Sequence, residues 1–202
     1  MRMHRVYTLC VTATLVLTAS LNCSLLSAQP IINPMQIWTP ATDGMRMAIS
    51  PVRLGIAIQQ DVEFYLAFQN IGAKDFVLNL GMMLGNGKVQ EPGAIRLILT
   101  EPNGQTREFQ CSNVRAIGGR VDDFLAALPV GATYILKLNL NQYCCNTPGV
   151  KLAAGRYRIA AQYKGMGAQY VNLDTPGIRL LNFWTGSLQT NPLEFEIADQ
   201  RP

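Results

Sequence analysis

The sequence predicts an all-β protein: an antiparallel β-sandwich of about eight strands with one short helical segment near 122–128. Two observations predict it. Apolar residues recur at every second position in many stretches after residue 44, and clusters of Gly, Pro and Asn separate these stretches. Such alternation gives each strand one apolar and one polar face, which is typical of antiparallel sheets. Two such sheets bury their apolar faces against each other, and a closed barrel is the alternative.

The predicted strands follow one another from residue 45 to residue 197. Their alternating apolar positions are Met45, Met47 and Ile49; Leu54, Ile56 and Ile58; Val62, Phe64, Leu66 and Phe68; Phe76, Leu78 and Leu80; Ile95, Leu97 and Leu99; Phe109 and Cys111; Tyr134, Leu136, Leu138 and Leu140; Tyr157, Ile159, Ala161 and Tyr163; and Leu193, Phe195 and Ile197. The pair Asn103-Gly104 predicts a hairpin turn, because tight hairpins favour Asn-Gly.

The stretch Asp122–Leu128 (DDFLAAL) predicts about two helical turns, bounded by Gly119 and Pro129. Asp122 or Asp123 would cap this helix by accepting hydrogen bonds from its first N–H groups. Ahead of it, glycine permits a turn in which Arg120 bonds a carboxylate. A calcium site is the alternative for the adjacent carboxylates, but the D-x-D-x-D-G spacing of such sites is missing.

The ends of the chain predict its domain organisation. Residues 1–28 carry Arg2 and Arg5 ahead of an apolar stretch and small residues before Gln29, the pattern of a secretory signal peptide. An uncleaved N-terminal anchor is the alternative. We expect an N-terminal extension at 29–44 and a single domain at 45–198, in a secreted or periplasmic protein without a membrane span after signal removal.

Removal of residues 1–28 would change the chemistry that the chain can perform. The formal net charge of +4 would fall to +2 with the loss of Arg2 and Arg5, and the single histidine, His4, would be lost. Scattered charge of this size does not indicate a nucleic-acid partner. Without histidine there is no Ser-His-Asp or Cys-His arrangement. We therefore expect no enzyme activity, metal or cofactor; a carboxylate mechanism is the remaining catalytic alternative.

Several side chains are candidates for contacts with a partner. They are the loop residues Arg120, Asp122 and Asp123 and the aromatic residues Tyr170 and Trp184. The two aromatic residues could stack on a sugar or peptide, or they could cover the end of the core. Met82 and Met83, between glycines, are expected in the core, although exposed methionines can form an adaptable binding surface.

Three cysteines follow residue 28: Cys111, Cys144 and Cys145. Side chains two residues apart share a face of a strand. Continuing the alternation of Tyr134 to Leu140 puts Cys144 inward, as Cys111 is, and this predicts a Cys111–Cys144 disulfide. Cys145 would then be a free thiol or the link of a disulfide-bonded dimer. A bulge near Asn141 would exchange the roles of Cys144 and Cys145.

Four segments carry a resemblance to a family. They are FYLAFQNIGAKDFVLNLG, LPVGATYILKLNL, LAAGRYRIAAQY and FWTGSLQTNPLEFEI. With them, the chain from about Ile37 to Ile197 resembles secreted bacterial proteins with an immunoglobulin-like β-sandwich domain of unknown function, and more weakly intracellular proteinase-inhibitor-like domains. The third segment resembles a tyrosine corner, in which Tyr157 would return its hydroxyl to the preceding loop; a core-facing tyrosine is the alternative.

These observations favour a non-catalytic binding or interaction module at or outside the cell surface, with a protein or glycan partner. A protease-inhibitor-like domain acting through exposed loops is the alternative. The resemblance implies a fold and supplies no catalytic residues.

Overall fold

Twelve strands and two short 3₁₀ helices form the part of the chain that the computed structural model describes, residues 37–53, 55–58, 60–84, 89–111, 119–143, 151–170 and 176–199. The strands are β1 (Met45–Pro51), β2 (Ile56–Ala57), β3 (Glu63–Asn70), β4 (Phe76–Leu84), β5 (Gln90–Glu91), β6 (Ile95–Thr100), β7 (Thr106–Gln110), β8 (Val121–Leu128), β9 (Thr133–Asn139), β10 (Gly155–Lys164), β11 (Ser187–Gln189) and β12 (Leu193–Ala198). The helices are η1 (Leu140–Gln142) and η2 (Pro176–Leu180). The all-β class is confirmed.

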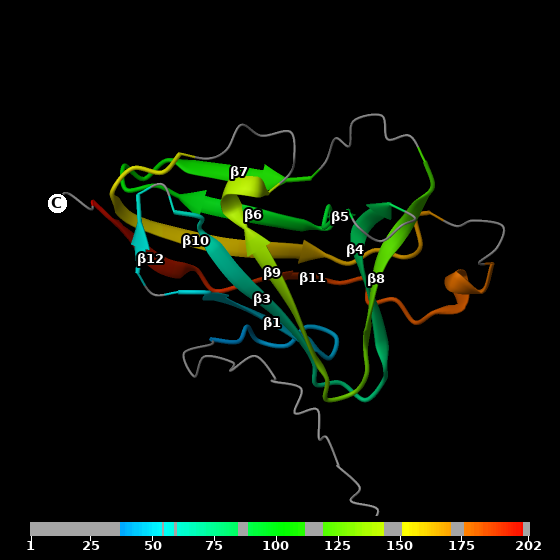
Figure 1. Cartoon of the computed structure of the whole chain (residues 1–202). Coiled ribbons are helices and arrows are strands. Elements are labelled where there is room, and N and C mark those ends of the chain that lie inside the picture. Colours follow the sequence, from blue (N-terminus) through cyan, green and yellow to red (C-terminus); the bar gives the residue numbers. More distant parts are fainter. Residues whose placement is uncertain are drawn as a thin grey trace, which may run out of the picture. The chain divides into compact units, whose positions relative to one another are not determined.

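Two sheets pack against each other to enclose most of the core. One has the order β1-β3-β9, and the other has the order β2-β12-β10-β6-β7, with β11 also paired to β10. Figure 1 shows β3 and β9 running obliquely in front of β10 and β6. Phe64 of β3 meets Phe195 of β12 at a centroid distance of 5.5 Å, and Phe68 of β3 meets Tyr163 of β10 at 5.1 Å. Edge-to-face ring pairs therefore join the two sheets.

A third sheet, β5-β4-β8, extends beyond the packed pair (Figure 1). β3 pairs with β9, and β4 pairs with β8. Because β3 leads into β4 and β8 leads into β9, both connections pass between the two sheets at the same corner. Asn70 holds this corner: its Nδ2 donates to the carbonyls of Lys74 and Leu128 at 2.7 and 2.9 Å, and its Oδ1 accepts from Gly72 N–H at 2.9 Å. The side chain is fully buried, and all its polar atoms are satisfied.

The helical segment predicted at 122–128 is wrong, because these residues lie in β8. The strand pairs antiparallel with β4 along its whole length, with a register shift between Asn79 and Met82. Phe124, Ala126 and Leu128 are buried at every second position. This period of two fits a strand, and a helix of two turns would have gained little stability by itself. The proposed capping role of Asp122 or Asp123 is therefore also wrong.

The Asn103-Gly104 hairpin turn and the tyrosine corner, unlike the helix, occur as predicted. β6 and β7 form an antiparallel hairpin across Asn103-Gly104, where Glu101 N–H donates to the Gln105 carbonyl at 2.8 Å and Gly104 has φ +82°. The Tyr157 hydroxyl donates to the Ala153 carbonyl at 3.0 Å, as a tyrosine corner requires. The pair Asn86-Gly87 lies outside the described residues.

Part of the expected N-terminal extension packs on β1. Thr39 N–H donates to the Met47 carbonyl at 2.9 Å, and Met47 N–H donates back to Thr39 Oγ1 at 3.1 Å. The Arg46 guanidinium lies 4.8 Å from the centre of the Trp38 ring. No helix found in the described parts of the chain has the length and apolar character of a membrane-spanning helix.

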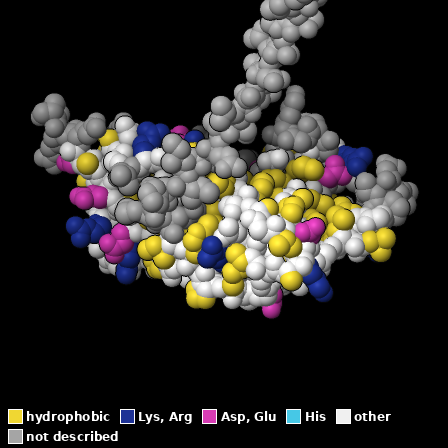
Figure 2. Space-filling view, turned by 90° about the horizontal axis from the view of Figure 1, so that it is seen from below, with side chains coloured by type: hydrophobic (Ala, Val, Ile, Leu, Met, Phe, Trp, Pro, Cys, Tyr) yellow, Lys and Arg dark blue, Asp and Glu magenta, His cyan; other side chains and the backbone are white. Residues whose placement is uncertain are grey.

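Figure 2 shows hydrophobic side chains over much of one face, with basic and acidic side chains lying singly or in small groups among them.

Candidate functional site

A cavity of about 230 Å³ lies where β4 and β5 meet the segment after β10. Eight described residues line it: Gly81, Met82, Glu91, Gly93, Cys111, Met166, Gln169 and Tyr170. Two of them, Gln169 and Tyr170, are exposed, so the cavity opens to the surface beside them. Concave sites with apolar walls and a few polar groups are the usual form of a binding site.

The floor of the cavity is formed by backbone that only glycine allows to approach so closely. Gly81 lies at the register shift of β4 with φ +137°. A Cβ there would collide with Glu91 O and Gly93 N, and a Cβ on Gly93 would lie 2.8 Å from the Cys111 carbonyl oxygen. The β4 bulge, the β5–β6 turn and the end of β7 are therefore packed backbone to backbone, which gives the floor a fixed shape.

Asp123 fixes the wall of the cavity from behind. This side chain is 2 % exposed. Its carboxylate accepts from Asn79 Nδ2 at 2.8 Å and from the backbone N–H groups of Gln169 and Tyr170, each at 3.0 Å. Asn79 Nδ2 also donates to the Gly167 carbonyl at 2.8 Å. Residues 167–170, which have no regular secondary structure, are thus held against the paired strands β4 and β8 by hydrogen bonds to a carboxylate. Hydrogen bonds to a charged acceptor are stronger than those to a neutral one.

Two methionines and a tyrosine give the cavity its adaptable surface. Met82 is buried, Met166 is partly buried, and Tyr170 is 42 % exposed. The thioether chains adjust to irregular shapes, and the aromatic ring combines an apolar body with a polar tip. Met82 therefore combines the two roles considered for the methionines of this stretch, because its side chain packs in the core and also borders the cavity.

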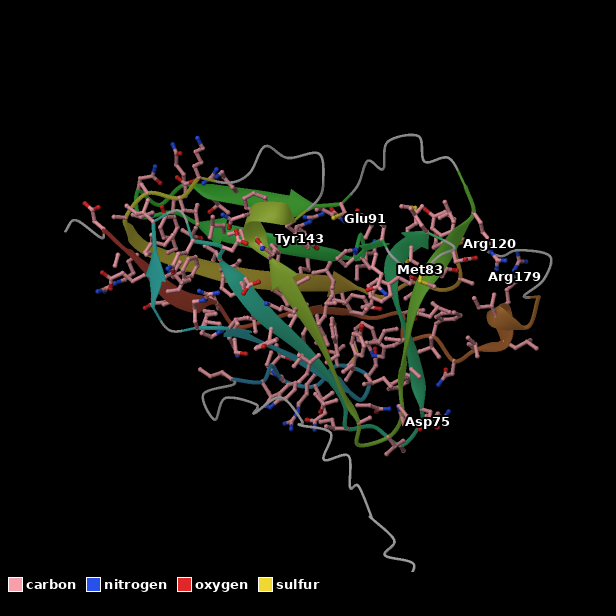
Figure 3. All side chains as sticks on the ribbon, in the orientation of Figure 1. Asp75, Met83, Glu91, Arg120, Tyr143 and Arg179 are labelled. Carbon is pink, nitrogen blue, oxygen red and sulfur yellow. The ribbon has the colours of Figure 1, made fainter. Side chains whose placement is uncertain are left out.

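The acidic residue of the lining is Glu91. Met82 of β4 pairs in register with Glu91 on one side and with Asp123 on the other, so two carboxylates flank one strand position. Figure 3 shows Glu91 near Tyr143. Burial raises the pKa of the Tyr143 hydroxyl, and the negative charge of Glu91 raises it further. That hydroxyl donates to the Ile95 carbonyl at 2.7 Å.

The structure brings some of the predicted interaction residues together and separates others. Asp123 and Tyr170 meet at the cavity wall. Arg120, which Figure 3 shows beside the start of β8, forms an ion pair with Asp122 at 2.8 Å, but neither residue lines the cavity. Trp184 is buried and stacks on Tyr163 with a centroid distance of 5.7 Å. Of the two roles expected for it, stacking on a ligand or covering the core, it has the second.

The cysteine prediction rested on a strand that continues to Cys144, and β9 instead ends at Asn139. Leu140–Gln142 form η1, and Tyr143 follows it as the cap. The alternation therefore does not reach Cys144. Cys111 borders the cavity, whereas Cys144 and Cys145 lie outside the described residues. The choice between these two partners stays a prediction.

Sequence reasoning missed Gly93, Glu91 and Met166 as parts of a site. A two-residue strand such as β5 is too short to show an alternating pattern. Nothing in the local sequence indicates that the segment after β10 packs against β4. The Gly81-Met82-Met83 stretch was the usable signal, since a glycine within a strand often marks a bulge. No cluster of three or more metal-binding side chains occurs in the described ranges.

Comparisons with known proteins give no family. No family model matches the chain, and no curated protein matches it. One similar solved structure is described as "AvmM Catalyzes Macrocyclization in Alchivemycin A Biosynthesis"; it is 13 % identical, with a TM-score of 0.32, over 82 % of this chain and 97 % of that chain. A likeness this low carries no argument about fold or function.

Proposed function

We propose that the chain is an exported, immunoglobulin-like β-sandwich module that binds a partner through the cavity between β4, β5 and the 166–170 segment, without catalysing a reaction. The observation that carries the proposal is the contrast between a fixed floor and an adaptable rim. Gly81 and Gly93 fix the floor, and Asp123 holds the wall, while Met166 and Tyr170 supply side chains that can adjust to a ligand. A preorganised site of this kind loses little entropy on binding.

The immunoglobulin-like assignment is supported by the two facing sheets and by the Tyr157–Ala153 hydrogen bond. A domain of this class usually binds through loops at one end of the sandwich. The cavity fits that rule, because its rim lies in the connection between β10 and β11.

An affinity capture comparing two variants tests the proposal. Tyr170→Ala removes the ring at the rim, and Leu180→Ala removes a large, 88 % exposed apolar side chain that does not line the cavity. We expect extracellular or envelope material from the host to be retained by the parent and by Leu180→Ala and lost by Tyr170→Ala. Retention by all three proteins would overturn the cavity as the binding site. Stoichiometric inhibition of a captured protease would favour the inhibitor alternative.

Export is the part of the proposal that the first 28 residues support. Fractionation of host cells expressing the full chain, followed by N-terminal sequencing, tests it. We expect a periplasmic or secreted product that begins near Gln29. A full-length cytosolic product would contradict export, and a full-length membrane-bound product would favour the uncleaved anchor.

The cysteines supply a further part of the proposal: Cys144 pairs with Cys111, and Cys145 is free or links a dimer. A disulfide that closes about 34 residues contributes roughly 3–4 kcal/mol in the chain-entropy model. Peptide mapping without reduction identifies the pair, and a non-reducing gel detects the dimer. A Cys111–Cys145 peptide would overturn the pairing with Cys144, and three reduced cysteines would overturn the disulfide.

A further inference from the structure

The turn that joins β6 to β7 is open to solvent. Pro102, Asn103, Gly104 and Gln105 are all exposed. A Cβ built on Gly104 would meet no described atom within 4 Å beyond its chain neighbours. Water and hydroxide therefore reach both the Asn103 side chain and the peptide group that follows it.

Two hydrogen bonds set the geometry of this Asn-Gly pair. Asn103 Oδ1 accepts from Gln105 N–H at 2.9 Å and so closes a ring of atoms that includes the Gly104 nitrogen. A donor on this oxygen stabilises the negative charge that develops there when a nucleophile adds to the amide carbon Cγ. Gly104 N–H donates to the Glu101 carbonyl at 2.9 Å, so this second bond has to open before the nitrogen reacts. Local opening of an exposed turn costs little free energy.

We propose that Asn103 is a site of spontaneous covalent modification in the folded chain, at which the main-chain nitrogen of Gly104 attacks the side-chain amide. The nitrogen loses its proton to solvent and forms a bond to Cγ of Asn103, and the side-chain amino group leaves as ammonia, so that a cyclic imide results. Water then opens the ring: cleavage at Cγ gives aspartate, and cleavage at the main-chain carbonyl gives isoaspartate. Glycine favours the reaction because no side chain hinders the approach.

Either product changes the β6–β7 hairpin. A carboxylate replaces a neutral amide near Glu101, whose own carboxylate pairs with Arg107. Isoaspartate also places one more carbon atom in the main chain of the turn, which disturbs the spacing of the Gly104–Glu101 hydrogen bond. We therefore expect the bond from Glu101 N–H to the Gln105 carbonyl to weaken, and the modified hairpin to fray from its tip.

Incubation of the purified protein in mildly alkaline buffer, followed by tryptic digestion and mass spectrometry, tests the proposal. Peptide 97–107 should appear in two new forms, isoaspartate and aspartate, and the conversion should be about tenfold faster for each unit of pH because it needs the deprotonated Gly104 nitrogen. Asn103→Gln, whose longer side chain closes the ring less readily, should leave the peptide unmodified over the same time. Aspartate alone would overturn the proposal, since direct hydrolysis of the amide gives no isoaspartate; so would an unchanged peptide.

Urea at concentrations below the unfolding transition shows whether the reaction takes place in the folded chain. Because the free energy of unfolding falls linearly with urea, the unfolded fraction rises steeply there. We expect the rate of conversion at Asn103 to stay constant over this range, because the turn is already exposed in the folded chain. A rate that rises in proportion to the unfolded fraction would overturn modification of the folded chain. Neither outcome bears on the cavity, so the proposed function is tested separately.

Discussion

The Asn79 amide and the Asp123 carboxylate meet inside the β4–β8 ribbon, with Nδ2 2.8 Å from Oδ1. Both side chains also reach the segment after β10: Asn79 through the Gly167 carbonyl and Asp123 through two backbone N–H groups. Asn79 Oδ1 accepts from Gly81 N–H at 3.1 Å, so the same pair supports the β4 bulge. One buried polar pair thus determines both the floor and the wall of the cavity.

Replacing Asp123 with Asn should loosen this segment and destabilise the fold. The Asn side chain offers one oxygen where the carboxylate offers two, and its NH₂ group faces donors, so buried N–H groups lose their acceptor. We expect the free energy of unfolding to fall by about 1–3 kcal/mol, measured by urea denaturation, and the Gln169 and Tyr170 amides to exchange faster with solvent.

The matched control is Asp122→Asn, the same change one residue earlier. Asp122 pairs with the half-exposed Arg120, and such surface pairs contribute about 0–1 kcal/mol. Equal losses in the two variants would contradict the role given to Asp123.

Asn70→Ala should destabilise the corner shared by the β3–β4 and β8–β9 connections. The change leaves the carbonyls of Lys74 and Leu128 without their side-chain donor and Gly72 N–H without its acceptor. Because Asn70 and Leu128 are fully buried, water does not readily replace the bond to the Leu128 carbonyl, and we expect a loss of about 1–3 kcal/mol by urea denaturation. Asn103→Ala, in the exposed β6–β7 turn, serves as the comparison and should cost less; a larger loss there would contradict this reasoning.

The sequence was sufficient for the fold class, because period-two alternation along Glu63–Asn70 and Gly155–Lys164 reports directly which face of a strand is buried. It was insufficient for β8, where two adjacent carboxylates hid the alternation of Phe124, Ala126 and Leu128. Asp123 occupies a buried position only because Asn79 and the 167–170 segment supply donors. Partners so distant in the chain leave no local pattern, so the cavity could not be predicted.

Acid should remove a stabilising contribution of Glu63. The hydrogen bond from Lys137 holds the pKa of this carboxyl below its usual 4.5, with further help from Arg53 and opposition from partial burial. A carboxyl whose pKa is lower in the folded chain stabilises the fold above the unfolded pKa and ceases to do so as the pH falls through the folded value. Glu63→Gln should therefore lower the melting temperature at pH 7 and equal the parent at pH values well below 4.5. A difference that grows in acid would contradict the assignment.

The packing around Trp184 leaves little room for additional volume. Its indole stacks on Tyr163, and two glycines pack against this residue: a Cβ on Gly165 would collide with the Trp184 carbonyl oxygen and lie 2.7 Å from Cε3, and one on Gly186 would lie 2.6 Å from Cη2. The Nε1 group is already buried without a hydrogen-bond partner among the described residues, so small shifts bring no compensating bond.

Gly165→Ala should therefore overpack the core and lower the free energy of unfolding by about 1–3 kcal/mol. Near-ultraviolet circular dichroism should change as well, because the methyl group displaces the indole from its stack. Gly177→Ala adds the same methyl group in η2, where no atom lies within 4 Å of the new Cβ, and should cost nothing measurable. If Gly165→Ala instead unfolds at the same urea concentration as Gly177→Ala, the indole has room to move, and the tight packing assigned to this end of the core is wrong.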